Sequence, residues 1–407
     1  MAMKQTQTKL FDFSDVGLDF CAGSKSLFPD RFKKMLALGY NVQTVTNVAV
    51  IGDQVTFTYG GAHGYVADRV LKVDSGALAA INGGEFWIDS VTTNTVTMVI
   101  DNAPLSVANG FTTRIASLGW SLEYEVANVH VYKFKQLDES DVYLRLCFAV
   151  PGASRCFIAP CVGSDFDIST GFIVDNYALT ANKSVTNPTA QASMFRWEFS
   201  GISTTNYDNY SASQGKSVFG SAFMVGSKYH LFFANNHFNS SGRGVVNGLA
   251  PHFTHNYPQL NLPLMWGYNI ETINTYNTTQ YTSPMKAYIG NIESAFVAST
   301  NSAANIVASP QAVNAYTTLD SFNTTTVEPL PIYERNTRQH LGYVCGAIYI
   351  AKYSATNGPS LGLQNSPFFT ADIELESNIL VHHTVSGDAS LGYATFYAIP
   401  VEEIKIV

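Results

Sequence analysis

Hydrophobic and polar residues alternate with a period of two along most of the chain, and this pattern predicts β-strands. It is clear in residues 54–59, with the sequence QVTFTY, and in residues 95–100, with the sequence TVTMVI. It returns in residues 129–134, 142–148 and 228–233. Successive side chains of a strand point to opposite faces of a sheet, so the alternation indicates sheets with one face turned to a core. We therefore predict an all-β protein.

One short helix is predicted near the start of the chain, between Pro29 and Leu38. Proline is favoured in the first turn of a helix, and Gly39 supplies a stop signal. Turn residues such as Gly60-Gly61 and Asn357-Gly358 separate the predicted strands.

The chain divides into three predicted parts. Residues 1–40 form an N-terminal arm with the short helix, which either docks on a neighbouring subunit or adds a strand to its own sheet. Residues 41–116 form a small β-barrel-like module, and residues 117–407 form a larger β-sandwich-like domain. Segments 180–193 and 300–326 are rich in Asn, Ser, Thr and Ala, which indicates long loops. Loops of this length usually carry binding or assembly roles.

Composition narrows the classes of protein to consider. Only 13% of the 407 residues are charged, against about 25% in an ordinary soluble domain. The net charge is −8, with no basic stripe of the kind that nucleic-acid binding requires. We therefore expect no nucleic-acid partner. No apolar stretch approaches the length of about 20 residues that a membrane span needs, and the first residues lack the apolar core of a signal peptide.

Residues that could carry chemistry are few, and each has a simple structural interpretation. His63 stands in a glycine-flanked turn, where a hydrogen-bonded role is expected. Asp165 and Asp167 would share one side of a strand, where they could hold Ca²⁺ or cap a turn, and the turn is the preferred interpretation. Two histidine pairs are present, His252 with His255 and His382 with His383. Two histidines three apart can bind a metal from one helical face, but Pro251 and Pro258 predict a loop or short strand there, and interface or surface histidines are the preferred interpretation. The five cysteines show no paired metal spacing: Cys21, Cys147, Cys156, Cys161 and Cys345. We expect free, buried thiols, no cofactor, no metal and no enzymatic activity.

Aromatic side chains interleaved with Asn, Ser and Thr fill residues 195–290. Tyrosine and tryptophan are enriched at protein interfaces and have one apolar face and one polar edge. The members expected in loops are candidates for a subunit interface or for glycan contact: Tyr207, Tyr210, Trp266, Tyr268, Tyr276 and Tyr281.

The small module carries a resemblance to known proteins. Val55-Thr-Phe-Thr-Tyr59, Ala62-His-Gly-Tyr-Val66 and Ile81-Asn-Gly-Gly-Glu-Phe86 follow one another in an order that resembles a β module of tailed-bacteriophage tail and baseplate proteins. Leu118-Gly-Trp120 and Phe166 to Phe172 continue the similarity into the larger domain. The resemblance covers about residues 41–235 and contains no catalytic motif.

The resemblance implies a structural component of a phage virion, placed in the tail tip, baseplate or fibre attachment and assembled in the host cytoplasm. Its expected partners are copies of itself and other virion proteins. Two alternatives stay open: a receptor-binding protein that contacts host-surface glycan, and a capsid decoration or head-fibre protein.

Overall fold

The computed structural model describes the following residues, and every statement of absence below concerns these alone: 2–4, 6–153, 155–188, 194–201, 205–219, 221–236, 244–255, 260–269, 285–286, 292–294, 326–334, 337, 339–352, 367–372, 377–385 and 394–404. Strands make up 47% of the structure and helices 9%. The fold is all-β, as the alternation predicts, and the described strand pairs are antiparallel.

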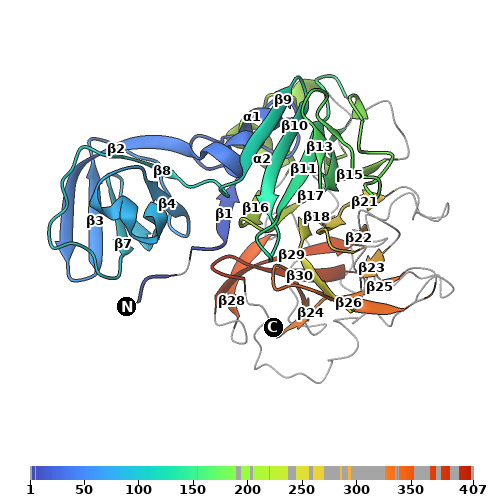
Figure 1. Cartoon of the computed structure of the whole chain (residues 1–407). Helices are drawn as coiled ribbons and strands as arrows, with labels where there is room; N and C mark the ends of the chain where they lie inside the picture. Colours follow the sequence, from blue (N-terminus) through green and yellow to red (C-terminus); the bar gives the residue numbers. More distant parts are fainter. Residues whose placement is uncertain are drawn as a thin grey trace.

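Residues 40–115 form the small module, which projects from the rest of the molecule (Figure 1, left). Seven strands make one sheet in the order β5-β4-β8-β2-β3-β7-β6. Their bounds in chain order are β2 (Tyr40–Ile51), β3 (Gln54–Tyr59), β4 (Val70–Val73), β5 (Glu85–Trp87), β6 (Ser90–Val91), β7 (Thr95–Val99) and β8 (Thr112–Ile115). Short 3-10 turns, Ala77–Ala80 and Asn82–Gly84, precede β5.

The module sheet does not close into a barrel, but its two edges belong to one chain segment. β5 and β6 lie at opposite ends of the strand order and are separated in sequence by Ile88 and Asp89. The N–H of Ile88 donates to the carbonyl of Arg69, next to β4 (2.9 Å), whereas the N–H of Asp89 donates to Thr97 in β7 (3.0 Å). Two consecutive residues therefore tie together the two edges of a rolled sheet.

The larger body is built from stacked sheets. Its central sheet has the order β1 (Lys9–Asp12), β16 (Ala222–Gly226), β17 (Leu231–Asn236), β18 (Gly244–Ala250), β20 (Leu264–Trp266) and β22 (Met285–Lys286). A second sheet lies on one face, in the order β21 (Tyr268–Asn269), β15 (Phe195–Ser200), β12 (Cys156–Gly163), β11 (Asp141–Phe148), β10 (Val129–Lys135) and β9 (Ser121–Val126). A hairpin of β13 (Phe166–Asp167) and β14 (Phe172–Ile173) follows β12.

Two further sheets cover the other face of the central sheet. One has the order β24 (Thr326–Pro329), β27 (Tyr349–Lys352), β30 (Ala394–Pro400), β29 (Ser377–Val385) and β28 (Phe368–Asp372). The other, called here the four-stranded sheet, has the order β19 (His252–Thr254), β26 (His340–Val344), β25 (Pro331–Glu334) and β23 (Ile292–Ser294). The larger body therefore has three layers of sheet, one more than the predicted sandwich.

Every residue of β16, β17 and β18 is buried. Phe233 faces a core shared with the second sheet, whereas the adjacent Phe232 belongs to the core shared with Leu380 of β29. Strands covered on both faces lose the apolar-polar alternation, because both sides then need apolar residues.

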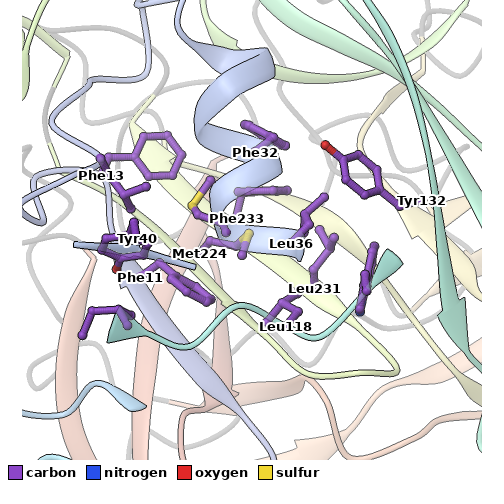
Figure 2. Packing of buried hydrophobic residues seen from close by; sticks show 14 of the residues in the cluster. Phe11, Phe13, Phe32, Leu36, Tyr40, Leu118, Tyr132, Met224, Leu231 and Phe233 are labelled. Carbon is purple, nitrogen blue, oxygen red and sulfur yellow. The ribbon is translucent and has the colours of Figure 1, made fainter. Parts of the chain in front are cut away.

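The first 40 residues belong to this body. β1 pairs with β16, so the segment adds a strand to its own sheet, one of the two predicted alternatives. The expected helix is present as α1 (Phe28–Lys33), which continues as one wide π-helical turn (Lys34–Leu38) and ends at Gly39 with a φ of 76°. Phe32 lies between the layers, close to Phe233 (Figure 2). Its ring centre is 5.1 Å from that of Phe233 and 5.4 Å from that of Phe148. A second helix, α2 (Ala212–Phe219), follows a 3-10 turn (Thr205–Tyr207).

Candidate functional site

A buried ion pair connects the module to the body. The guanidinium of Arg69, just before β4, donates from Nε to Oδ2 of Asp15 (2.8 Å) and from Nη2 to Oδ1 (3.0 Å). Both side chains are 7% exposed, and the hydroxyl of Tyr40 donates to the same carboxylate at 2.8 Å. Burial and the negative charge of Asp15 together raise the pKa of Tyr40 well above its usual range. Its hydroxyl therefore remains a donor.

Electrostatics decide the charge state of Arg69. Burial alone would lower the pKa of its guanidinium, but the adjacent Asp15 carboxylate outweighs burial and raises that pKa above its ordinary value. Arg69 therefore keeps its positive charge. Two parallel hydrogen bonds fix the relative orientation of the Arg69 and Asp15 side chains as well as their distance. The pair therefore favours one orientation of the module on the body.

Residues beside this pair extend the junction. Lys9 in β1 pairs with Glu85 of the module at 2.8 Å, and the ammonium group of Lys4 lies 4.8 Å from the ring centre of Trp87. Leu10 and Trp87 share one buried cluster with the sheets of the body. The module is thus attached by charge, hydrogen bonds and apolar contact.

His63 holds the glycine-rich turn, as expected. Its Nδ1 accepts the backbone N–H of Tyr65 (2.9 Å), and its Nε2 bonds to the carbonyl of Thr95 (3.1 Å). The side chain is 2% exposed and lies against the ring of Tyr59. Both nitrogens are occupied, which assigns His63 a structural role.

Three of the six aromatic residues predicted at an interface or glycan contact have side chains that the structure describes: Tyr207, Tyr210 and Trp266. Tyr207 and Tyr210 are half-buried and stand edge to face, 4.7 Å apart. Trp266 is fully buried against Phe232, so on this folded chain it contacts neither a partner nor a glycan. Its assignment to an interface is corrected: an unbroken buried strand holds the ring in the core. Tyr268 lies in β21, next to β15, and two positions lie outside the described residues: Tyr276 and Tyr281.

The remaining polar candidates have structural partners. Oδ1 of Asp167 accepts from the N–H (2.8 Å) and hydroxyl (2.7 Å) of Ser169, which is the predicted turn cap. Nε2 of His382 bonds to the carbonyl of Asn235, and Nε2 of His383 accepts the N–H of Gly244. All five cysteines are buried and free. Among the described residues, no three His, Cys, Asp or Glu side chains form a group that could hold a metal, and no helix is long and apolar enough to span a membrane.

An exposed aromatic cluster on the four-stranded sheet was not predicted from the sequence. Phe253 (47% exposed) and Tyr343 (45%) stand directly opposite each other on β19 and β26. The ring of His340 lies 4.9 Å from Tyr343 and 5.2 Å from Tyr333. The ring of His255 lies 5.5 Å from that of His340. Phe253 lies within the aromatic tract of residues 195–290, but that tract does not indicate which rings meet across the sheet.

Comparison with known proteins gives no family. No protein-family model matches the chain, and no curated protein is significantly similar to it in sequence. The resemblance of residues 41–116 to a phage tail module therefore stays a prediction from the residues themselves.

Proposed function

We propose that the chain is a structural subunit of a tailed-phage virion, located in the tail tip, baseplate or fibre attachment. It acts by packing against copies of itself and against other virion proteins. The observation that carries the proposal is the module, whose residues resemble a tail module and which forms a separate rolled sheet joined to the body by a buried ion pair. A subunit that sets the positions of its neighbours needs such a fixed connection.

Surface composition supports assembly. The chain has about half the usual charge, and a free monomer normally keeps more charge for solubility. The long strand β2 exposes Val42 (61%) and Ile51 (76%), and the loop after β7 exposes Leu105 (95%). Single exposed apolar residues are ordinary, and these three are spread over the module, where each is a candidate contact point in an assembly.

Genetic complementation tests this proposal. A phage with the gene for this chain disrupted is supplied with either the wild-type chain or the double variant Val42→Glu/Ile51→Glu. Electron microscopy then counts complete tails. We expect wild type to restore them and the variant to fail, while thermal unfolding of the purified variant matches wild type. Complete tails formed without any copy of the chain would overturn the proposal.

A further inference from the structure

A buried lysine and a buried aspartate lie in contact inside the body. Nζ of Lys25, in the segment before α1, is in contact with Oδ1 of Asp208, which follows the 3-10 turn Thr205–Tyr207. The two side chains are 3% and 11% exposed. The contact therefore brings an amine and a carboxyl group from distant parts of the chain together, away from water.

The carboxyl group of Asp208 is held on one side only. Its Oδ2 accepts the backbone N–H of Gly152 at 3.0 Å. No described residue donates a hydrogen bond to the buried Oδ1, although the amine of Lys25 is in contact with it. The contact is close but lacks the geometry of a hydrogen bond. The pair thus lacks the directed bond that normally compensates the burial of a charged oxygen.

Hydrogen bonds on both sides of Lys25 fix the two segments against each other. The N–H of Ser26 donates to the carbonyl of Asp208 (3.0 Å), and the hydroxyl of Ser24 donates to the carbonyl of Tyr210. Lys25 stands between these two donors, so its amine has little freedom to leave the carboxyl group. Two groups held together in this way react far faster than the same groups free in solution.

The surroundings of Lys25 are apolar. Cys21, Phe28 and Cys156 belong to one buried cluster, and the N–H of Phe28 donates to the carbonyl of Lys25. Burial raises the pKa of the Cys156 thiol, and the charge of Lys25 is the largest influence that opposes it, so the amine lies near this thiol. In such an interior, transfer of a proton from the ammonium group to the carboxylate removes both charges. The neutral amine that results is the nucleophilic form.

We propose that Lys25 and Asp208 form a covalent amide bond inside the folded chain. The lone pair of Nζ forms the bond to Cγ of Asp208, and the bond from Cγ to one carboxyl oxygen breaks. That oxygen leaves as water with two of the three protons of the ammonium group, so the pair supplies every atom of the reaction. The amide ties the segment before α1 to the rest of the body, as a disulfide would. This bond does not depend on the proposed place in a virion.

Mass spectrometry of the full chain tests the inference. The protein is purified and stored folded, then denatured, reduced and measured intact and after trypsin digestion. We expect the main species to be lighter than the sequence by one water. Cleavage after Lys25 should be blocked, and residues 10–31 should be found joined to residues 197–216. The unreduced sequence mass with normal cleavage after Lys25 would overturn the proposal. Loss of water without joined peptides would overturn it too, because an aspartate that cyclises on its own backbone gives that result.

Variants assign the bond to its two residues. Lys25→Met and Asp208→Ala should each abolish the loss of water completely. Lys135→Met is the matched control, because Lys135 pairs with Asp141 at the surface, where the side chains are 41% and 43% exposed. This control should keep the mass and the joined peptides of wild type. Circular dichroism confirms that each variant is folded. A loss of water that persists in Lys25→Met or Asp208→Ala would contradict the assignment.

Discussion

The carboxylate of Asp15 and the guanidinium of Arg69 form two parallel hydrogen bonds in the interior, 54 residues apart in sequence. One side chain belongs to the body and the other to the module. Removing one member of a buried pair leaves the other charge uncompensated, which typically costs about 3–5 kcal/mol. The pair is therefore one of the contacts that hold the module in place.

We expect Asp15→Asn to lower the free energy of unfolding by about 3 kcal/mol or more, measured by urea denaturation. Asp141→Asn is the control, because Asp141 pairs with Lys135 on the surface, where both side chains are more than 40% exposed. Surface pairs contribute little, so the control should unfold like wild type. Equal stability of the two variants would show that the junction does not depend on the buried pair.

A pair of glycine substitutions tests the start of the module. Gly39 and Gly52 both have positive φ values, 76° and 61°. A Cβ at Gly39 would meet the carbonyl oxygen of Ile115, whereas one at Gly52 would meet nothing within 4 Å. Alanine at either site would have to adopt a left-handed backbone conformation, which costs about 1–2 kcal/mol. We expect Gly39→Ala to lose clearly more thermal stability than Gly52→Ala, and an equal loss would contradict the close approach.

Arg145 should control the loop that covers the outer face of the second sheet. It is fully buried, and it donates to the backbone carbonyls of Gly171, Asn182 and Val185. Lysine keeps the charge but lacks the planar set of donors that reaches three acceptors. Each buried acceptor left unmet costs about 1–3 kcal/mol. Arg145→Lys should therefore accelerate trypsin cleavage after Lys183.

The control for this experiment is Lys133→Met, a substitution on the exposed side of β10. Its cleavage after Lys183 should match wild type. If Arg145→Lys is cleaved at the wild-type rate and unfolds normally, the loop is held by its apolar contacts alone.

Stability should fall as the solution is acidified, in part because of His230. Burial alone lowers its pKa to about 3, and its Nδ1 lies 2.7 Å from the hydroxyl of Ser227. Unfolded histidine binds a proton below about pH 6.5, whereas folded His230 does not, so the unfolded state gains protons as pH falls. Each such histidine adds up to about 1.4 kcal/mol per pH unit to the slope of the unfolding free energy against pH.

The slope of unfolding free energy between pH 6 and pH 4 measures this effect. His230→Gln should make the slope shallower. The same slope in wild type and His230→Gln would mean that the histidine protonates in the folded protein.

Local patterns in the sequence predicted local structure well. The proline and glycine around residues 29–39 mark a helix that is present from Phe28 to Leu38. Alternation in residues 54–59 marks β3. The sequence did not predict which sheet the first strand joins. β1 pairs with β16, more than 200 residues later, and the alternation within a strand does not identify its partner strand.

Contacts between distant segments explain what the sequence did not reveal about the sites. Trp266 was expected at an interface because polar residues follow it, but it ends a buried strand under Phe232. Phe253 and Tyr343 are 90 positions apart and meet only through strand register. A short window of sequence encodes neither the burial of Trp266 nor the pairing of Phe253 with Tyr343.

Quantitative mass spectrometry of purified tails tests the central claim most directly. The proposal places the gene for this chain in a phage genome, and particles are taken from a lysate of that phage. Peptides of the chain should appear in tails at a fixed ratio to the other tail proteins and should persist through repeated density-gradient purification. The same peptides present in the lysate but absent from purified particles would contradict the account.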